Sequence, residues 1–244
     1  MKKTENKQTE VISGSVAQAA DRYAIDALGI SSLKLMRRAS QAVADHVVRQ
    51  VLPKTGLRPV LVLAGMGNNG ADGLCIARLL QAAGISVQVV LCGNLLSASW
   101  ECLHQLSECR KNKVPLAAYR PSGSGAYGSG SDCQWPDGAI LIDALFGVGL
   151  NRAVRGQYEV CIREMARQRF VYRIAVDIPS GIHADSGAVM GIALPADETV
   201  TIGRLKSGLL TGSGPQYAGK LTVRRIGIPA VAYQKALASL SKTV

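Results

Sequence analysis

The chain has 244 residues, of which 48% are hydrophobic and 18% are charged, so the composition predicts a folded domain with a sizeable core and excludes disorder of the whole chain. No apolar run approaches the roughly 20 residues of a membrane-spanning helix, and we expect no secretory signal in the polar residues 1–10. The 28 Lys and Arg residues exceed the 17 Asp and Glu residues and give a net charge of +11. Because the basic residues are spread along the chain and only 5% of residues are aromatic, this charge favours solubility or a phosphate-bearing ligand over nucleic acid.

The six cysteines indicate a reducing compartment. None of them forms a C-x-x-C pair, so zinc binding and thioredoxin-like chemistry have no support. Most of them lie in apolar stretches, where a cysteine is usually a small core residue. We therefore predict a cytoplasmic protein that needs no disulfide bonds.

The N-terminal part of the chain has the pattern of two helices that follow a tail at residues 1–10. The first helix is predicted over about residues 15–28. Ser31 or Ser32 can cap a second helix, which continues to about Leu52 with apolar residues on one face.

From residue 59 onward, short apolar runs alternate with helical segments. Such alternation predicts buried parallel strands with helices on both faces of the sheet. We predict an α/β fold: a three-layer, Rossmann-like, doubly wound, mostly parallel sheet with extra N-terminal helices, in one domain over residues 11–232 with a tail at residues 233–244. The strands are expected at residues 59–64, 85–92, 139–145, 173–178, 198–202 and 220–226, and the helices at residues 71–83, 96–111 and 158–168.

One segment, residues 121–132, is rich in Gly and Ser and interrupts this alternation. Its composition predicts a mobile loop. We interpret it as a surface insertion rather than as a functional lid.

The first candidate site follows the first predicted strand of the sheet. Residues 65–73 read GMGNNGADG, which places G-x-G-x-x-G between a strand and a helix. Glycines there allow the backbone to approach a ligand, and the N–H groups at the start of the helix can bind phosphate. An NAD(P)-dependent dehydrogenase would also have an acidic residue about 20 positions further on, but residues 73–100 contain no Asp or Glu. Asn68, Asn69 and Asp72 instead place three oxygen-bearing side chains in this segment.

Two further strand ends carry an aspartate after an apolar run. Asp143 begins the segment DALFGVGL, and Asp177 begins the segment DIPSG. An Asp in an apolar strand is costly to bury unless it is paired or bound to a cation, and hard cations take oxygen ligands. Arg152 and Arg155 follow the first of these segments and can meet phosphate. Because the carboxyl ends of parallel strands share one edge, these residues predict a site with oxygen ligands and a phosphate-binding loop.

A hydrolase triad is the competing interpretation of the segment after Asp177. Ser180 and His183 follow it, but the motif G-x-S-x-G is absent from this segment, and the serine and the histidine are close neighbours in the sequence. This spacing gives a triad no support.

Taken together, the three motifs resemble those of the NAD(P)H-hydrate epimerase family, also called the YjeF N-terminal-domain family. That family has a GxGNNGGDG loop, a DALFGTGL strand end, a DIPSG turn followed by D-[ST]-G, and a T-x-x-F/I-G-x-x-K-x-G-L segment. In this chain the matching residues are 65–73, 143–150, 177–181, 185–187 and 199–209. The resemblance covers about residues 12–230.

The resemblance implies interconversion of the R and S hydrates of NADH and NADPH (NADHX and NADPHX) at C6 of the nicotinamide ring, in nicotinamide nucleotide repair. It also implies a potassium ion (K+) near the substrate, a homodimer, and a functional link to a dehydratase that uses ATP or ADP. When the family's residues are carried over motif by motif, the resemblance implies that Asn69, Asp143 and Ser180 are the K+ ligands. The residues expected to bind the substrate are Asn68, Asn69, Gly70, Ala71, Asp72, Gly147, Val148, Gly149, Leu150, Asn151, Arg152, Ala153 and Asp177.

The reaction needs a group that gives and takes a proton, whether C6 loses and regains its hydroxyl group or the ring opens and closes. We assign this catalytic role to Asp177. Lys206 is the second candidate for this role, and the alternative interpretation is that Lys206 is a solvated surface residue.

The sequence departs from the family pattern at Ala71, Val148 and Ala153, and the methyl group of Ala71 is expected to lie near the phosphates. The alternative function is a non-catalytic nucleotide-binding or protein- or RNA-binding scaffold of the same fold. A scaffold has no need of buried oxygen ligands, so the residues at the strand ends favour the enzyme.

Overall fold

The computed structural model describes residues 11–121 and 136–241. The predicted tail at residues 1–10 lies outside these ranges, and so does the predicted loop at residues 121–132 apart from its first residue. Within the described ranges, no helix is long and apolar enough to cross a membrane. The five cysteines in these ranges are buried and free.

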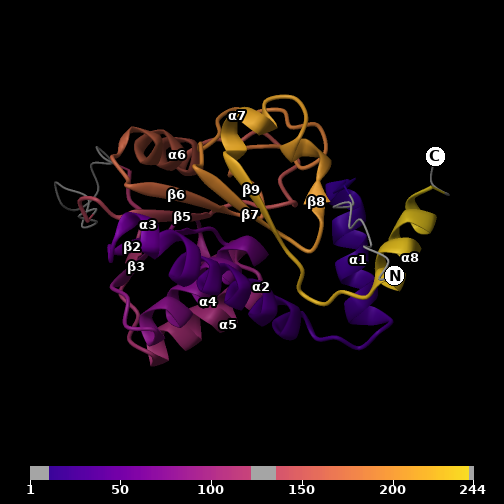
Figure 1. Cartoon of the computed structure of the whole chain (residues 1–244), viewed down its shortest axis with the longest axis horizontal. Coiled ribbons are helices and arrows are strands. Elements are labelled where there is room, and N and C mark those ends of the chain that lie inside the picture. The colour runs from indigo at the N-terminus through magenta and orange to yellow at the C-terminus, as the bar shows by residue number, and fades with distance from the viewer. Residues whose placement is uncertain (1–10, 122–135, 242–244) are drawn as a thin grey trace, which may run out of the picture.

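In the described part of the chain, seven parallel strands form the central sheet (Figure 1). The strand order is β4-β3-β2-β5-β6-β7-β9, so the chain builds one half of the sheet outward from β2 and the other half outward from β5. Parallel sheets bind ligands at the carboxyl ends of their strands, next to such a change of direction. The strands are β2 (Val60–Ala64), β3 (Val87–Leu91), β4 (Leu116–Ala118), β5 (Ile140–Ala144), β6 (Tyr172–Val176), β7 (Glu198–Ile202) and β9 (Lys220–Arg224).

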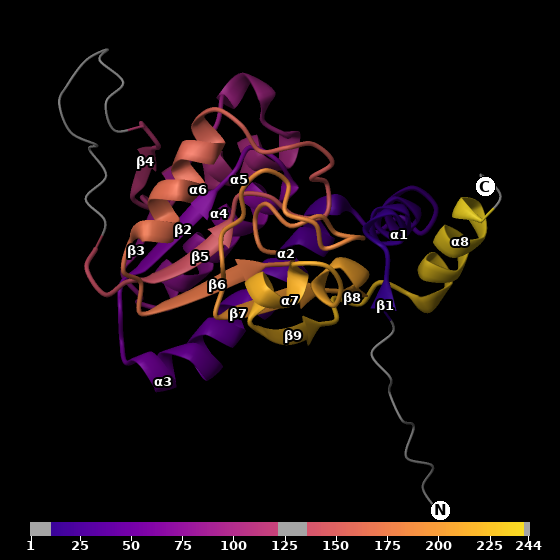
Figure 2. The ribbon, with the colours of Figure 1, turned by 90° about the horizontal axis from the view of Figure 1, so that it is seen from above.

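Helices cover both faces of the sheet, so the predicted three-layer arrangement is confirmed (Figures 1 and 2). Val60 and Val62 of β2 pack in the core on one face, and Leu61 and Leu63 pack in the core on the other. All of β2 is therefore buried, which explains its continuous apolar run. The covering helices are α2 (Ser32–His46), α4 (Asn68–Ala82) and α5 (Trp100–Lys111) on the first face and α6 (Gln157–Arg167) on the second.

Two helices that are far apart in the sequence pack together beyond one end of the sheet (Figures 1 and 2). α1 (Gly14–Asp26) lies against α8 (Ala230–Leu240), and Ala24 of α1 and Tyr233 of α8 are buried in one apolar cluster. The predicted tail at residues 233–244 is therefore wrong as far as residue 240. The apolar contact with α1 stabilises this helix, and the sequence of α8 alone does not indicate that contact.

Several short elements in the described part of the chain, among them β1, β4, β8 and α7, and one irregular turn are absent from the sequence prediction. The parallel pair of β1 and β8 joins the residues before α1 to the segment after β7 and so helps to position α1. The second helix predicted from the sequence corresponds to three consecutive elements in the structure: α2, a π-helical turn and the short helix α3. The bounds are β1 (Val11–Ile12), the π turn (Val47–Val51), α3 (Leu52–Thr55), β8 (Leu205–Lys206) and α7 (Gly214–Ala218), with β4 as given above.

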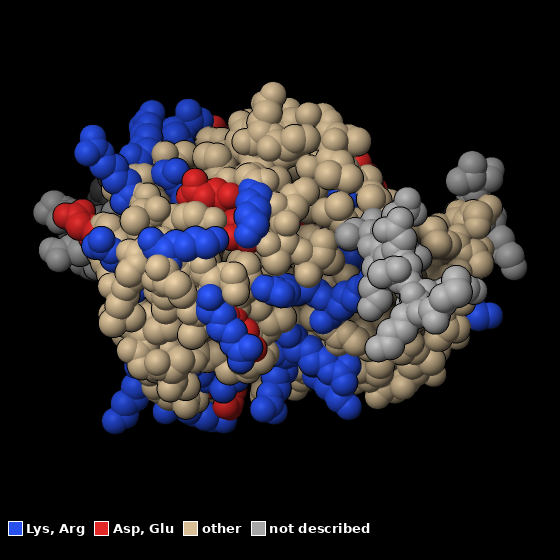
Figure 3. Space-filling view, viewed as in Figure 1, with Lys and Arg blue, Asp and Glu red and all other residues tan. Residues whose placement is uncertain are grey.

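The positive charge is spread over the surface. Figure 3 shows Lys and Arg side chains in several regions of one face, where they outnumber Asp and Glu. This distribution agrees with the spread of basic residues along the sequence.

Candidate functional site

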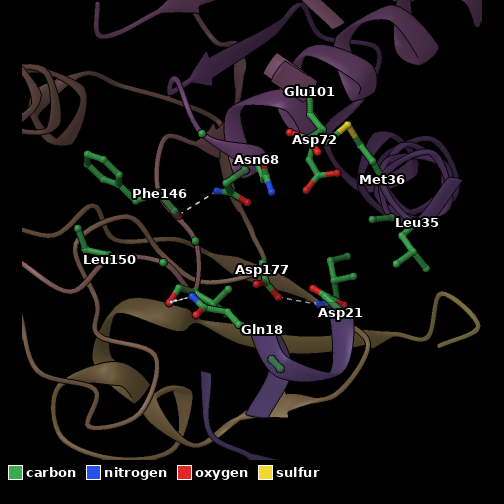
Figure 4. A pocket seen from close by; sticks show the side chains of 18 of the residues that line it. Gln18, Asp21, Leu35, Met36, Asn68, Asp72, Glu101, Phe146, Leu150 and Asp177 are labelled. Carbon is green, nitrogen blue, oxygen red and sulfur yellow. Dashed lines mark hydrogen bonds between the residues drawn. The ribbon is translucent and has the colours of Figure 1, made fainter. Parts of the chain in front are cut away.

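A cavity of about 710 Å³ lies at the carboxyl ends of β2, β5 and β6, where the two halves of the sheet meet (Figure 4). Its volume is within the usual range of small-molecule sites, about 300–1,000 Å³. The first turn of α4 and the segment after β5 form one part of its wall, and residues of α1 and α2 form another. The cavity therefore lies where the strand-end motifs predict a site.

The glycine-rich segment after β2 has no room for a side chain at Gly65 or at Gly70. A Cβ atom at Gly70 would lie 1.9 Å from the carbonyl oxygen of Gly65, and one at Gly65 would lie 2.1 Å from the carbonyl oxygen of Leu145. These contacts bring the start of α4 against the residue after β2, and that residue against the segment after β5, which only glycine permits.

The residues predicted in this segment divide into two groups. Asn68, Asn69 and Asp72 line the cavity, whereas Gly70 and Ala71 do not. Ala71 is fully buried in the core on the α4 side of the sheet. The helix turns this side chain into the core and away from the cavity, and the expected contact of its methyl group with the phosphates stays a prediction.

The segment after β5 is held by α4 and by α1 (Figure 4). The side-chain amide of Asn69 donates a hydrogen bond of 2.9 Å to the carbonyl oxygen of Phe146, and that of Gln18 donates one of 3.1 Å to the carbonyl oxygen of Val148. Ala153 is exposed and does not line the cavity, so its contact with the substrate stays a prediction. The predicted residues that do line it here are Gly147, Val148, Gly149, Leu150, Asn151 and Arg152.

Asp143 and Ser180, two of the predicted cation ligands, form one buried group. The hydroxyl of Ser180 donates to Asp143 Oδ1 over 2.6 Å, and its backbone N–H donates to Oδ2 over 2.8 Å. The backbone N–H of Phe146 donates to the same hydroxyl over 2.9 Å. Burial raises the pKa of Asp143 to about 6, although the hydrogen bonds from Ser180 and from the Leu145 backbone oppose the rise.

The oxygen atoms of this group suit a singly charged cation. Asp143 is 2% exposed, and none of the described Lys, Arg or His side chains forms an ion pair with it. Asn69 uses its amide nitrogen for Phe146, which leaves its carbonyl oxygen available. Asp143, Ser180 and Asn69 thus offer one charged and two neutral oxygens to a hard cation. In the described ranges, no group of three or more His, Cys, Asp or Glu side chains could hold a metal ion together.

Asp177, the predicted catalytic residue, lines the cavity directly after β6. Its φ angle is +70°, in the left-handed region that few residues other than Gly, Asn and Asp adopt. Its Oδ1 atom accepts hydrogen bonds from the Lys206 ammonium group, from the Ile202 backbone N–H at 3.0 Å and from the Thr201 hydroxyl at 3.2 Å. The Lys206 side chain is 2% exposed, so it is not a solvated surface residue.

Two cavity residues of α1, Gln18 and Asp21, are absent from the sequence prediction. They lie three positions apart and therefore share one face of the helix. Burial raises the pKa of Asp21 to about 6. The charge of Lys206 opposes this rise, and the charge of Asp177 adds to it. The polar residues within the helical pattern of α1 are the available signal, but the sequence does not show which face points to the cavity.

Asp72 lies where α4 meets α2. Its Oδ1 atom accepts a hydrogen bond of 3.2 Å from the hydroxyl of Ser40. Burial raises the pKa of Asp72 well above its usual range, with the charges of Asp177 and Asp21 adding to the rise and the Ser40 hydrogen bond opposing it. Three carboxyl groups therefore influence one another around the cavity.

The rejected hydrolase triad does not form. The Ser180 hydroxyl is engaged with Asp143, whereas His183 Nδ1 faces the backbone N–H groups of Asp185 and Ser186, each at 3.3 Å. The histidine thus stabilises its own turn. Asp185 in turn accepts a hydrogen bond from the backbone N–H of Gly14 and so secures the first turn of α1.

The fold and the cavity define an α/β protein of the Rossmann-like class, with a polar ligand site at the change of strand direction. The family model described as YjeF-related protein N-terminus matches residues 32–208, and this chain belongs to that family.

Relatives and a solved structure agree with this membership. A protein of Limosilactobacillus fermentum named NAD(P)H-hydrate epimerase is 39% identical over 214 residues, which is 88% of this chain and 95% of that protein. A protein of the same name from Levilactobacillus brevis is 36% identical over 220 residues, or 90% of this chain and 95% of the relative. The crystal structure of yeast ynu0, YNL200c, matches with a TM-score of 0.72 at 22% identity over 93% of each chain, which shows a common fold.

Proposed function

We propose that this protein is an NAD(P)H-hydrate epimerase, which interconverts the R and S hydrates of NADH and NADPH at C6 of the nicotinamide ring in nucleotide repair. The family membership and the names of the relatives support the proposal. The single observation that carries it is the placement of Asp177, an ion-paired carboxylate inside a cavity whose wall includes a helix N-terminus.

The start of α4 is the part of the cavity best suited to the phosphates of a dinucleotide. Its first turn has unpaired N–H groups, and a helix N-terminus attracts anions. Arg22, Arg152 and Arg204 also line the cavity and add positive charge. With the phosphates near this wall, the nicotinamide ring is assigned to the part of the cavity that contains Asp177.

The reaction requires proton transfer at the C6 hydroxyl group. An acid gives its proton to the hydroxyl oxygen, the C6–O bond breaks with its electron pair leaving on water, and the lone pair of the ring nitrogen forms a double bond to C6. Water then adds to the other face of C6 and returns a proton to the conjugate base, so no net proton is used. We assign this transfer to Asp177, whose carboxyl group Lys206 orients.

We also propose that K+ binds at Asn69, Asp143 and Ser180. The support is the buried carboxylate of Asp143, which lacks a cationic partner among the described residues, together with the hydroxyl oxygen of Ser180 that is hydrogen-bonded to it. When bound, the ion supplies a positive charge that balances Asp143. The backbone of Phe146 is hydrogen-bonded to Ser180 and Asn69, so the cation would also stiffen the segment that lines the cavity.

The test follows purified R-NADHX by stereoisomer-resolving chromatography, first in potassium buffer and then in sodium buffer. We expect conversion to the S form faster than the spontaneous rate, and faster in potassium. Equal acceleration in both buffers would remove the K+ proposal and leave the epimerase. A folded protein that accelerates the conversion in neither buffer would favour the non-catalytic scaffold.

A homodimer, a functional link to a dehydratase that uses ATP or ADP, and a cytoplasmic location complete the proposal, and the family resemblance supports them. Light scattering after size exclusion tests the dimer, which requires a mass near twice 25.7 kDa. A coupled assay with such a dehydratase tests the link, because the epimerase should increase the yield from R-NADHX.

A further inference from the structure

We propose that Asp21 of α1 is a second proton-transfer residue in this cavity and acts together with Asp177 on the C6 hydroxyl group of the bound hydrate. This inference rests on the epimerase function proposed above. It assigns a catalytic role to a helix that lies outside the strand-end motifs.

The position of Asp21 is fixed by its helix. Gln18, Asp21 and Ile25 lie on one face of α1 and all line the cavity. The hydrogen bond from Gln18 to Val148 and the one from Gly14 to Asp185 attach this helix to the segments beside the cavity. The Asp21 carboxyl group is therefore held at the site rather than carried by a free helix.

Asp21 differs from the other two carboxyl groups in its partners. Asp177 Oδ1 accepts three hydrogen bonds and pairs with Lys206, and Asp72 is bonded to Ser40. In the described part of the chain, the carboxyl group of Asp21 has no hydrogen bond and no ion pair, so it is free to bond to a ligand. Figure 4 shows Asp21 and Asp177 in the same part of the cavity, and the two charges affect each other.

The protonation of Asp21 suits the task. Burial raises its pKa to about 6, while Lys206 and Arg22 oppose the rise and Asp177 adds to it. Asp72 of α4 and Tyr233 of α8 also face this group, since the charge of Asp21 raises the pKa of each. A carboxyl group with this pKa can donate a proton and take it back near neutral pH, as general acid–base catalysis requires.

The two carboxyl groups then have different roles in one balanced step. Protonated Asp21 gives its proton to the C6 hydroxyl oxygen, the C6–O bond breaks with its electron pair on the departing water, and the ring nitrogen forms a double bond to C6. The carboxylate of Asp177, held by Lys206, stabilises the positive charge that develops on the ring. Water adds to the other face of C6 and gives its proton to the Asp177 carboxylate, and a proton returns to Asp21 through solvent, so no net proton is used.

The experiment compares Asp21→Asn with Asp26→Asn in the R-NADHX assay. Asp26 is an exposed residue of the same helix that does not line the cavity, so it controls for loss of an aspartate from α1. We expect Asp21→Asn to lower kcat by on the order of 10²-fold or more with little change in KM, and Asp26→Asn to retain the wild-type rate. The pH profile is the second readout: wild-type kcat/KM should fall as the pH rises above about 6, and Asp21→Asn should lack this decline.

The opposite results are equally clear. If Asp21→Asn retains the wild-type rate, Asp21 has no role in the proton transfer. The same follows if kcat/KM of the wild-type enzyme does not fall above about pH 6. In both cases the epimerase function stands. A wild type that does not epimerise removes both. If Asp21→Asn fails to fold by circular dichroism, Asp21→Glu decides, because a carboxyl group displaced by one methylene should lower kcat and keep the pH-dependent decline, whereas an unchanged kcat contradicts the role.

Discussion

Asp177 and Lys206 are 29 positions apart in the sequence and form an ion pair in which the lysine side chain is 2% exposed. The same ammonium group donates a hydrogen bond of 2.6 Å to the carbonyl oxygen of Ile202. Lys206 therefore links the end of β7 to the carboxyl group at the end of β6. This link helps to hold Asp177 at its φ angle of +70°.

Replacing Lys206 with Met removes the cation and leaves the Asp177 carboxylate without its partner. Breaking a buried pair in this way costs about 3–5 kcal/mol, so we expect a loss of stability of this order in urea unfolding and a strong loss of epimerase activity. The double variant Lys206→Met/Asp177→Asn should recover part of the stability, since Asn tolerates a positive φ and carries no charge, but none of the activity. A single variant as stable as the wild type would contradict the ion pair.

The Ser180→Ala substitution tests the group around Asp143. It removes one of the donors to Asp143 Oδ1 and the acceptor of the Phe146 backbone N–H, and leaving a buried group unsatisfied costs about 1–3 kcal/mol. We expect that loss in urea unfolding and a higher K+ concentration for half-maximal activity. The exposed Ser186→Ala in the same segment is the control. An unchanged K+ dependence of Ser180→Ala would argue against Ser180 as a ligand.

The burial of Ala71 leads to a prediction that separates stability from binding. Glycine in a helix costs roughly 0.5–1 kcal/mol relative to alanine, and the lost methyl group adds about 0.8 kcal/mol. Ala71→Gly should therefore lower the free energy of unfolding by about 1–2 kcal/mol and leave KM unchanged. Ala82→Gly, at the exposed C-terminal end of the same helix, should have a smaller effect. A clear change in KM for Ala71→Gly would place the methyl group near the ligand after all.

The sequence predicts the central sheet well because its signals are local. β2 is an apolar run, β5 is apolar apart from Asp143, and both are buried on both faces, so their signal does not depend on distant residues. α8 lacks such a signal, since it is stabilised by contact with α1 from the other end of the described chain. β4 has only three residues, too few for a periodic pattern.

The candidate site divides in the same way. The strand-end residues Asn69, Asp143 and Asp177 could be predicted because the carboxyl ends of parallel strands meet at one edge. The contribution of Asp21 depends on how α1 packs against α8 and how β1 pairs with β8. Those contacts join segments nearly the whole domain apart, so no local pattern reveals them.

A second buried polar cluster, away from the cavity, joins α2 to the edge of the sheet. Glu198 Oε1 lies 3.0 Å from His46 Nε2 and accepts a hydrogen bond of 2.6 Å from the Thr222 hydroxyl, while Oε2 accepts one of 3.1 Å from the Tyr172 hydroxyl. Arg224 lies 2.7 Å from His46 Nδ1 and can only donate, so that nitrogen accepts and the ring proton is on the side of Glu198. The cluster thus contains a neutral histidine and an ionised glutamate.

This cluster predicts loss of stability in acid. Burial alone would raise the pKa of Glu198, but hydrogen bonds from Thr222, His46 and Tyr172 lower it to about 2, below its ordinary value of 4.5. The native state therefore binds fewer protons than the unfolded state, so the stabilisation is complete above about pH 4.5 and is lost as the pH falls towards 2. Burial lowers the pKa of His46 and acts in the same direction from about pH 6.5 downward.

Thermal unfolding between pH 7 and pH 3 measures this effect through Glu198→Gln. The variant should be less stable than the wild type at pH 7, because the charged acceptor is lost from a site with four donors around it. Its Tm should then decline less steeply as the pH falls, since the titrating carboxyl group is gone. The control is Glu108→Gln, at an exposed pair with Lys111, where we expect little change in Tm at any pH. A Glu198→Gln variant whose Tm declines in parallel with that of the wild type would show that the acid sensitivity arises elsewhere.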